Sequence, residues 1–275
     1  MDSDILSQLD DGILTITLNR PASLNGLTIS MTRRLNDRLR EAAASPAVRV
    51  VLLTGAGRAF CAGGDIKEFD AIDREDPEWV KWKDDPVWND IDTSAERTRR
   101  ASEGPLLLHG MPKPTIAVVR GACVGAAVAL AASCDFRIVS DTSFFSTAFA
   151  RIGISGELGA SYYLTKLVGV AKARELFFFS DRVGAVDALQ MGLVNKVVPD
   201  AALEAEVALF ARRLADGPPL AYRFIKANLN AAETQCAEDM VAMEALNQVR
   251  VLRTADAKEA ITAFFEKRKP VFTGR

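Results

Sequence analysis

Residues Gly55–Glu68 read GAGRAFCAGGDIKE, and this stretch marks the point where a strand gives way to a helix. The run that precedes it, Val48–Thr54, is rich in branched apolar residues and predicts a strand buried on both faces. The small residues of Ala62–Gly64 leave the backbone uncovered, so that a ligand can approach its N–H groups. A helix beginning near Asp65 would add unpaired donors, and Asp65 itself is best explained as the cap of that helix.

Two further junctions have the same small-residue character. Gly121–Asp135 leads from a strand into a helix built almost wholly from alanine, glycine and valine, which indicates very close packing. In the third junction, Arg151–Leu164, Glu157 lies in a small-residue turn before a helix. A carboxylate beside apolar residues there is a candidate acid/base with a raised pKa. A glutamate in the first turn of a helix, serving its dipole, explains the residue equally well.

The segments around these junctions alternate between strand and helix patterns. Strands are predicted at residues 13–18, 48–54, 115–119, 136–139 and 193–198, and helices at 28–44, from 125 and at 185–190. Ser30 is the expected N-cap of the first helix. After residue 200 the chain is expected to be helical, at residues 201–216, 218–231, 239–252 and 256–267. The pattern indicates an α/β core with a C-terminal helical part, and the charged stretch 69–104 is expected to be an irregular helical excursion over the core.

Composition excludes several classes of function. The 275 residues carry a formal net charge of −2, which provides no general field for attracting nucleic acid or an anionic membrane. No stretch approaches the roughly 20 apolar residues that span a bilayer, and the acidic N-terminus does not resemble a secretory signal. The four cysteines show no close pairing, which favours the reducing cytoplasm. The single histidine, His109, gives no basis for a histidine-rich metal site and is expected at a helix end rather than in catalysis.

Four motifs, taken in order, resemble the enoyl-CoA hydratase/isomerase (crotonase) superfamily over nearly the whole chain. They are the loop Leu18–Asn25, the junctions Gly55–Glu68 and Gly121–Asp135, and the helix-to-strand segment Gly184–Asn195. The resemblance implies a crotonase-like α/β spiral of ββα units over residues 1–200 and a C-terminal helical oligomerisation module over 201–275. It also implies an acyl-CoA thioester as substrate, no separate cofactor, no metal, and a homo-oligomer that is a trimer or a dimer of trimers.

The resemblance also assigns residues to a site. The backbone N–H groups of Gly64 and Ala126 would hold the thioester oxygen. The adenine and pantetheine of coenzyme A would lie along Ala22, Ser23, Leu24, Ala62 and Ile66. Phe264 and Lys267 match residues that reach coenzyme A, in some members from a neighbouring subunit, but a solvated charge explains Lys267 equally well. Phe149 is a candidate for the acyl pocket, together with Phe144, Phe145, Tyr162 and Tyr163, and a place in the core explains most of these aromatic residues equally well.

The two glutamates of the family's hydratases are replaced in this chain by Ala129 and Phe149, and neither can move a proton. Glu157 remains, at the place where several double-bond isomerases of the superfamily carry an acidic base. The resemblance therefore favours isomerisation of a double bond in fatty acid metabolism, or hydration by a single carboxylate, through an enolate held in an oxyanion hole. Two alternatives stay open: a thioester hydrolase or decarboxylase of the same fold, and an acyl-CoA-binding member without catalysis.

Overall fold

Two sheets form the centre of the molecule. The computed structural model describes residues 4–65 and 90–275. The larger sheet has six strands in the order β1-β2-β3-β4-β6-β9. Neighbouring strands run parallel, apart from the antiparallel pair of β1 and β2. The bounds of the six strands are Ile5–Asp10, Ile13–Leu18, Val50–Gly55, Thr115–Val119, Phe136–Ser140 and Lys196–Val198.

A smaller sheet repeats the same strand-strand-helix unit. β4 is followed by β5 (Ala122–Val124) and α6 (Ala126–Ala132), and β6 is followed by β7 (Phe144–Ser146) and α7 (Ala160–Phe179). β5 and β7 pair in parallel, and β8 (Val183–Gly184) adds antiparallel to β7. Because each unit places one strand in each sheet, successive units stack as turns of a spiral. The predicted α/β architecture of ββα units is confirmed.

The alternation of side chains along β3 divides the apolar packing between the two faces of the large sheet. Val51 and Leu53 belong to the main core. α1 (Ile29–Ala44), α5 (Glu103–Gly110), α6 and α8 (Ala185–Gln190) all contribute buried side chains to that core. Val50 and Leu52 instead face a second cluster, which α9 (Leu203–Ala215) covers with Leu203, Val207 and Ala211.

The N-cap of α1 is Thr28 and not the predicted Ser30. Thr28, in an extended conformation, accepts a hydrogen bond at its Oγ1 from the Met31 N–H at 3.0 Å. Ser30 lies inside the first turn, with its Oγ 3.1 Å from the Thr28 Oγ1, so the prediction of Ser30 as N-cap is wrong. Either residue type suits a cap, and the backbone conformation decides between them.

Most predicted elements are confirmed, and strands 13–18 and 115–119 and helix 185–190 match residue for residue. The predicted strand 193–198 is shorter, because the N–H groups of Leu193 and Val194 both donate to the Ala188 carbonyl and close the end of α8. Within the stretch 69–104, α4 (Ile91–Ala101) is helical and is capped by Asp90. Residues 66–89, with the three tryptophans, lie outside the described part of the chain.

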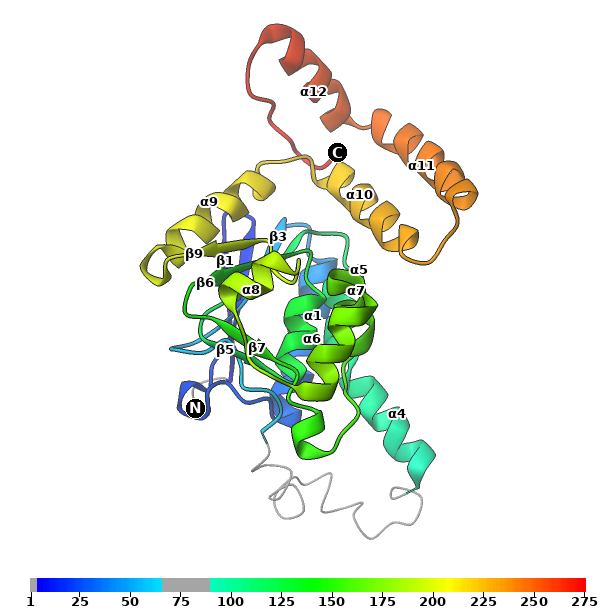
Figure 1. Cartoon of the computed structure of the whole chain (residues 1–275). Coiled ribbons are helices and arrows are strands. Elements are labelled where there is room, and N and C mark those ends of the chain that lie inside the picture. The colour runs from blue at the N-terminus through cyan, green and yellow to red at the C-terminus, as the bar shows by residue number, and fades with distance from the viewer. Residues whose placement is uncertain (1–3, 66–89) are drawn as a thin grey trace.

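The last three helices extend from the body of the molecule on the side opposite α4 (Figure 1). They are α10 (Pro219–Ala232), α11 (Ala237–Leu252) and α12 (Ala255–Glu266). Among the described residues, no helix has both the length and the apolar character that a membrane crossing requires. The division of the chain at residue 200 stays a prediction, since α9 packs on the sheet while the three later helices reach beyond it.

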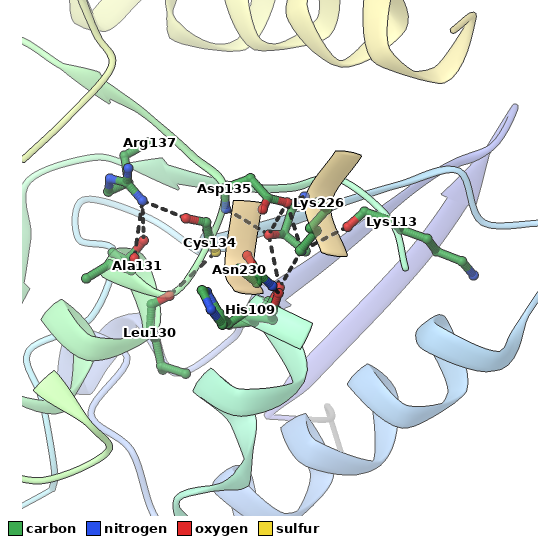
Figure 2. A network of polar contacts seen from close by, with 12 residues as sticks. His109, Lys113, Leu130, Ala131, Cys134, Asp135, Arg137, Lys226 and Asn230 are labelled. Carbon is green, nitrogen blue, oxygen red and sulfur yellow. Dashed lines mark hydrogen bonds and ion pairs between the residues drawn. The ribbon is translucent and has the colours of Figure 1, made fainter. Parts of the chain in front are cut away.

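A buried polar network attaches α10 to the core (Figure 2). The Lys226 Nζ forms an ion pair with the Asp135 Oδ2 at 2.8 Å and donates to the Leu108 carbonyl at 2.8 Å. One turn later, the Asn230 Nδ2 donates to the His109 carbonyl at 2.7 Å. His109 lies in the last turn of α5, which confirms its predicted place at a helix end.

Candidate active site

Two glycine corners lie side by side, one just after the end of β5 and the other just after the segment that pairs with β5. The Cys61 N–H donates to the Ala122 carbonyl and the Val124 N–H donates to the Cys61 carbonyl, both at 3.0 Å, so this segment pairs with β5. A Cβ built on Gly63 would lie 2.9 Å from the Val124 oxygen and 3.7 Å from the Gly125 Cα. The corner at residues 63–64 therefore packs directly on the corner at residues 125–126.

Both corners depend on glycine for their backbone conformation. Gly63 has a φ of +96°, and Gly125, which precedes α6, has a φ of +57° with a ψ of −124°. Residues with a Cβ are strained in these regions. The missing side chains also allow the two corners to approach each other closely.

The two predicted N–H donors are left without acceptors. The described residues supply no hydrogen-bond acceptor to the N–H of Gly64 or to that of Ala126, whereas the neighbouring Asp65 and Gly125 N–H groups are paired. Ala126 begins α6, where the N–H has no partner within the helix. Gly64 is half-buried and Ala126 is buried, so both N–H groups lie in a partly water-excluded place.

The loop that precedes α1 is fastened to the first corner by Asn25. Its fully buried Nδ2 donates to the carbonyls of Ala56 at 2.9 Å and Ala59 at 2.8 Å. The Ala62 N–H in turn donates to the Leu24 carbonyl at 3.0 Å. These bonds hold the exposed 3-10 turn of Pro21–Ser23 beside Ala62 and the first corner. The structure thus brings together the predicted coenzyme A residues Ala22, Ser23, Leu24 and Ala62, whereas Ile66 lies outside the described residues.

Asp65 forms an ion pair with Arg20, with the Nη1 and Oδ2 atoms 2.9 Å apart. Arg20 also donates to the Gly26 carbonyl at 2.6 Å, so it joins both sides of the loop. The helix that Asp65 was predicted to cap lies outside the described residues. Neither Asn25 nor Arg20 was predicted to have this role, and the nearest signal in the sequence is the Pro21 turn between them.

Glu157 lies in the loop between η2 (Ala150–Ile152) and α7, which begins at Ala160. The interpretation of Glu157 as a first-turn residue serving the helix dipole is therefore wrong. Its carboxylate is half-buried and makes no hydrogen bond or ion pair with the described residues. Burial raises the pKa of this carboxyl above its ordinary value. An unpaired carboxylate of this kind is a candidate acid/base.

Phe149 connects the Glu157 loop to the glycine corners. A Cβ on Gly156 would lie 3.7 Å from the Phe149 Cδ2, and a Cβ on Gly125 would lie 3.9 Å from the Phe149 Cε1. The ring is buried and stacks on Phe177 with the ring centroids 5.8 Å apart. The loop that carries Glu157 is thus packed against the second corner through the ring of Phe149.

The two positions that the resemblance assigns to the hydratase glutamates lie in an apolar cluster. Ala129 and Phe149 are buried together with Ala160, and Leu158 packs against them. Within this cluster no side chain can activate water.

Other candidate residues belong to the core, to the surroundings of His109 or to α12 and its end. Phe145 belongs to the main core, and the rings of Tyr162 and Tyr163 neighbour His109. Phe264 and Lys267, at the end of α12, are exposed and lie apart from the corners within the same chain (Figure 1). A contact between these two residues and a ligand at the corners would therefore need a second copy of the chain.

The buried thiols beside the corners are not activated. Cys61 and Cys123 are fully buried, and burial raises the pKa of the Cys61 thiol to about 12. Burial also raises the pKa of the Cys123 thiol well above its ordinary value. Both residues are small members of the hydrophobic core.

Known proteins match this chain over almost its full length. The model of a family described as enoyl-CoA hydratase/isomerase matches residues 8–275. The chain is 33% identical over 273 residues to the 1,2-epoxyphenylacetyl-CoA isomerase of Escherichia coli (strain K12), with 98% of each chain covered. It is 30% identical over 273 residues to the trans-2-decenoyl-(acyl-carrier-protein) isomerase of Streptococcus mutans, covering 99% of this chain and 98% of the relative.

Solved structures show the same similarity. The crystal structure of an enoyl-CoA hydratase from Bacillus anthracis has a TM-score of 0.87 to this chain at 29% identity. The match covers 99% of this chain and 100% of that one.

Proposed function

Because the chain belongs to the enoyl-CoA hydratase/isomerase family, we propose that it moves a carbon–carbon double bond in an acyl-CoA thioester. Gly64 and Ala126 would hold the thioester oxygen with their backbone N–H groups, and Glu157 would carry the proton. The observation that supports this most is the pair of packed glycine corners, each presenting an N–H that has no acceptor among the described residues. The loop of Ala22, Ser23 and Leu24 beside Ala62 would take the coenzyme A.

The reaction needs one base and one place for negative charge. The Glu157 carboxylate takes a proton from a carbon that is α or γ to the carbonyl, and the electron pair delocalises onto the thioester oxygen as an enolate. Two fixed N–H donors stabilise that oxygen without reorganising, and each is worth about 3 kcal/mol in comparable sites. Glu157 then returns the proton to the other carbon, so that the double bond has moved and no atom is gained or lost.

The apolar cluster around Ala129 and Phe149 favours isomerisation over hydration. Adding water requires a group that activates the oxygen and a group that protonates carbon, whereas moving a double bond requires a single carboxylate. Two of the proteins named above are isomerases by name, and the Bacillus anthracis structure is a hydratase by name. The names of the two isomerases specify a coenzyme A ester in one case and an acyl-carrier-protein ester in the other, so the carrier should be tested directly.

A panel of 2-enoyl and 3-enoyl thioesters on coenzyme A tests the reaction class. Migration of the double bond, followed through the absorbance of the conjugated thioester, supports isomerisation. Release of free coenzyme A would instead support a hydrolase, addition of water a single-carboxylate hydratase, and binding without change a silent member. The same esters on acyl carrier protein distinguish the two carriers.

The substitution Glu157→Gln tests the base. It removes the proton acceptor and keeps the shape, so isomerisation should become undetectable while affinity for the ester stays within a few fold. Glu41→Gln, on the exposed surface of α1, is the matched control and should retain wild-type turnover. Unchanged turnover in Glu157→Gln would remove this residue from the mechanism.

A further inference from the structure

A small, partly open cavity of about 10 Å³ lies between α1, α5 and α6. Its walls include Leu27, Leu35, Asn36, Gly104, Leu130 and Leu158. A space of this size holds roughly one water-sized group. Most of the lining is apolar, and the amide of Asn36 is an exception.

Three of the cavity walls adjoin the three parts of the proposed active site. Leu27 forms a bridge with Gly64, through its N–H to the Gly63 carbonyl and its carbonyl to the Asp65 N–H. Leu130 follows Ala126 by four residues, so both side chains lie on the same face of α6. Leu158 is the residue after Glu157. The cavity therefore adjoins the three segments that carry both N–H donors and the carboxylate, and its other walls come from α1, α4 and α5.

Asn36 places an unpartnered polar atom in this cavity. The residue is only 4% exposed, and its Oδ1 is a buried side-chain atom with no hydrogen-bond partner among the described residues. Its Nδ2 points to the Ala101 carbonyl at 3.4 Å. Exchanging the two amide atoms would set two acceptors against each other, so this orientation is the better one. A buried acceptor without a donor is unfavourable and calls for a partner.

Gly104 keeps the space next to that oxygen open. A Cβ built on Gly104 would lie 2.9 Å from the Asn36 Oδ1 and 3.4 Å from the Leu130 Cδ2. Any larger residue at position 104 would occupy the place that a donor to Asn36 must reach. The glycine and the asparagine together form a recess that fits one small donor group.

We propose that this recess is the inner end of the acyl site and that the Asn36 Oδ1 accepts a hydrogen bond from a hydroxyl group on the acyl chain. The inference rests on the proposed function, since it places the thioester at the two corners and the acyl chain along Leu27, Leu130 and Leu158. A hydroxyl group is small enough for the recess, carries no charge and can donate a hydrogen bond to the Asn36 Oδ1. The preferred substrates are then thioesters of hydroxylated acyl chains rather than plain ones.

Binding of unreactive esters tests the inference separately from turnover. Saturated acyl-CoA esters of increasing chain length are compared by calorimetry with the same esters bearing a hydroxyl at the chain end. At one chain length, the wild type should bind the hydroxylated ester about tenfold to a hundredfold more tightly, because a plain chain leaves the buried acceptor unpaired.

The variant Asn36→Leu keeps the side-chain volume and removes the acceptor. It should lose this selectivity and bind the plain ester at least as well as the wild type does. Thr32→Val is the matched control, because Thr32 lines the same cavity but its Oγ1 already donates to the Thr28 carbonyl at 2.8 Å. It should keep the hydroxyl preference within about twofold, since that hydroxyl is already paired. A melting curve for each variant verifies that it is folded.

The outcomes separate this inference from the proposed function. Equal affinity for the plain and the hydroxylated ester at every chain length overturns the inference. An ordered water would then be the hydrogen-bond partner of the Asn36 Oδ1. Selective binding without isomerisation supports the inference and overturns the proposed reaction. Failure to bind any ester overturns both.

Discussion

Gly63 and Gly125 show how a single missing Cβ can shape a reaction site. Each adopts a positive φ, and each lies within van der Waals reach of the opposite corner. The N–H groups of the next residues, Gly64 and Ala126, are consequently fixed by backbone geometry rather than by side chains. Donors fixed in this way need no rearrangement when charge develops on a ligand oxygen.

The substitution Gly63→Ala should separate the two corners. Its Cβ would lie 2.9 Å from the Val124 oxygen in a backbone conformation that is strained for alanine. We expect turnover to fall by about a hundredfold to a thousandfold, as when an oxyanion donor is lost. Stability should fall by about 1–3 kcal/mol.

Gly110→Ala is the matched control for this substitution. Nothing lies within 4 Å of a Cβ at position 110, and its φ is negative. Steady-state kinetics and urea unfolding of both variants provide the comparison. A fully active Gly63→Ala enzyme would argue against the corner as an oxyanion site.

The raised pKa of Glu157 makes a prediction about pH and activity. Burial disfavours the ionised carboxylate, so the pKa lies above its ordinary value of 4.5. The proposed base works only when ionised, and the rate should therefore rise with pH through this raised pKa. A rate profile that is flat over the acidic range would show that no such group controls the reaction.

The same shift predicts a change in stability. A carboxyl whose folded-state pKa is raised stabilises fully below its unfolded pKa, and that contribution is lost as the pH rises through the folded pKa. Glu157→Gln should therefore melt at a higher temperature than the wild type at neutral pH. The difference should disappear below roughly pH 4, where the wild-type carboxyl is also neutral. Melting curves across this range verify the sign.

Among the elements, α10 is the one that joins the exposed helices to the sheet. Its Lys226 side chain is 8% exposed and meets the 22% exposed Asp135 at 2.8 Å (Figure 2). Asp135 also accepts hydrogen bonds from the N–H and the Oγ1 of Thr115 at the start of β4. One ion pair thus joins the C-terminal helices to the beginning of a central strand.

Lys226→Met should weaken this attachment strongly. Removing one member of a buried ion pair leaves the other charge without compensation and costs about 3–5 kcal/mol. Lys172→Met is the matched control, because Lys172 pairs with Glu175 on the exposed surface of α7. The control should change the free energy of unfolding by less than about 0.5 kcal/mol. Both are measured by urea unfolding at one protein concentration, and equal effects would contradict a structural role for the buried pair.

At the scale of the whole molecule, the C-terminal helices carry apolar side chains that the single chain leaves exposed. α12 presents Phe264 and Phe265 at 79% and 76% exposure, and α11 presents Val241, Leu246 and Leu252. Exposed apolar surface of this kind marks an interaction site. We propose that a second copy of the chain covers it, which would also bring Phe264 and Lys267 to a neighbouring site.

Replacing Phe264 and Phe265 together by aspartate should weaken self-association by about tenfold or more, since each buried aromatic side chain contributes about 1.5–3 kcal/mol. Sedimentation at several concentrations measures the effect. Leu9→Asp, on the edge strand β1, is the control and should sediment as the wild type does. A wild type that is monomeric at all concentrations would contradict the assembly, whether a trimer or a dimer of trimers.

Local patterns were sufficient for much of the fold. Runs of branched residues predict β2, β3 and β4, and the spacing of apolar residues predicts α1, because these patterns reflect burial directly. The glycine junctions and the family resemblance together led to Gly64, Ala126 and Glu157. The choice between Thr28 and Ser30 as a cap could not be made in this way, because both hydroxyls suit the position and only the backbone conformation separates them.

The sequence by itself determined the family, the order of the elements and the residue types that the site can use, because these depend on composition and on neighbours along the chain. Only the tertiary structure decided that Gly63 meets Gly125, that Phe149 joins the Glu157 loop to the second corner, and that the Asn36 oxygen has no partner among the described residues. Each of these depends on which segments of the chain the fold brings together. Such contacts are set by how the sheets and helices pack, and no local pattern contains them.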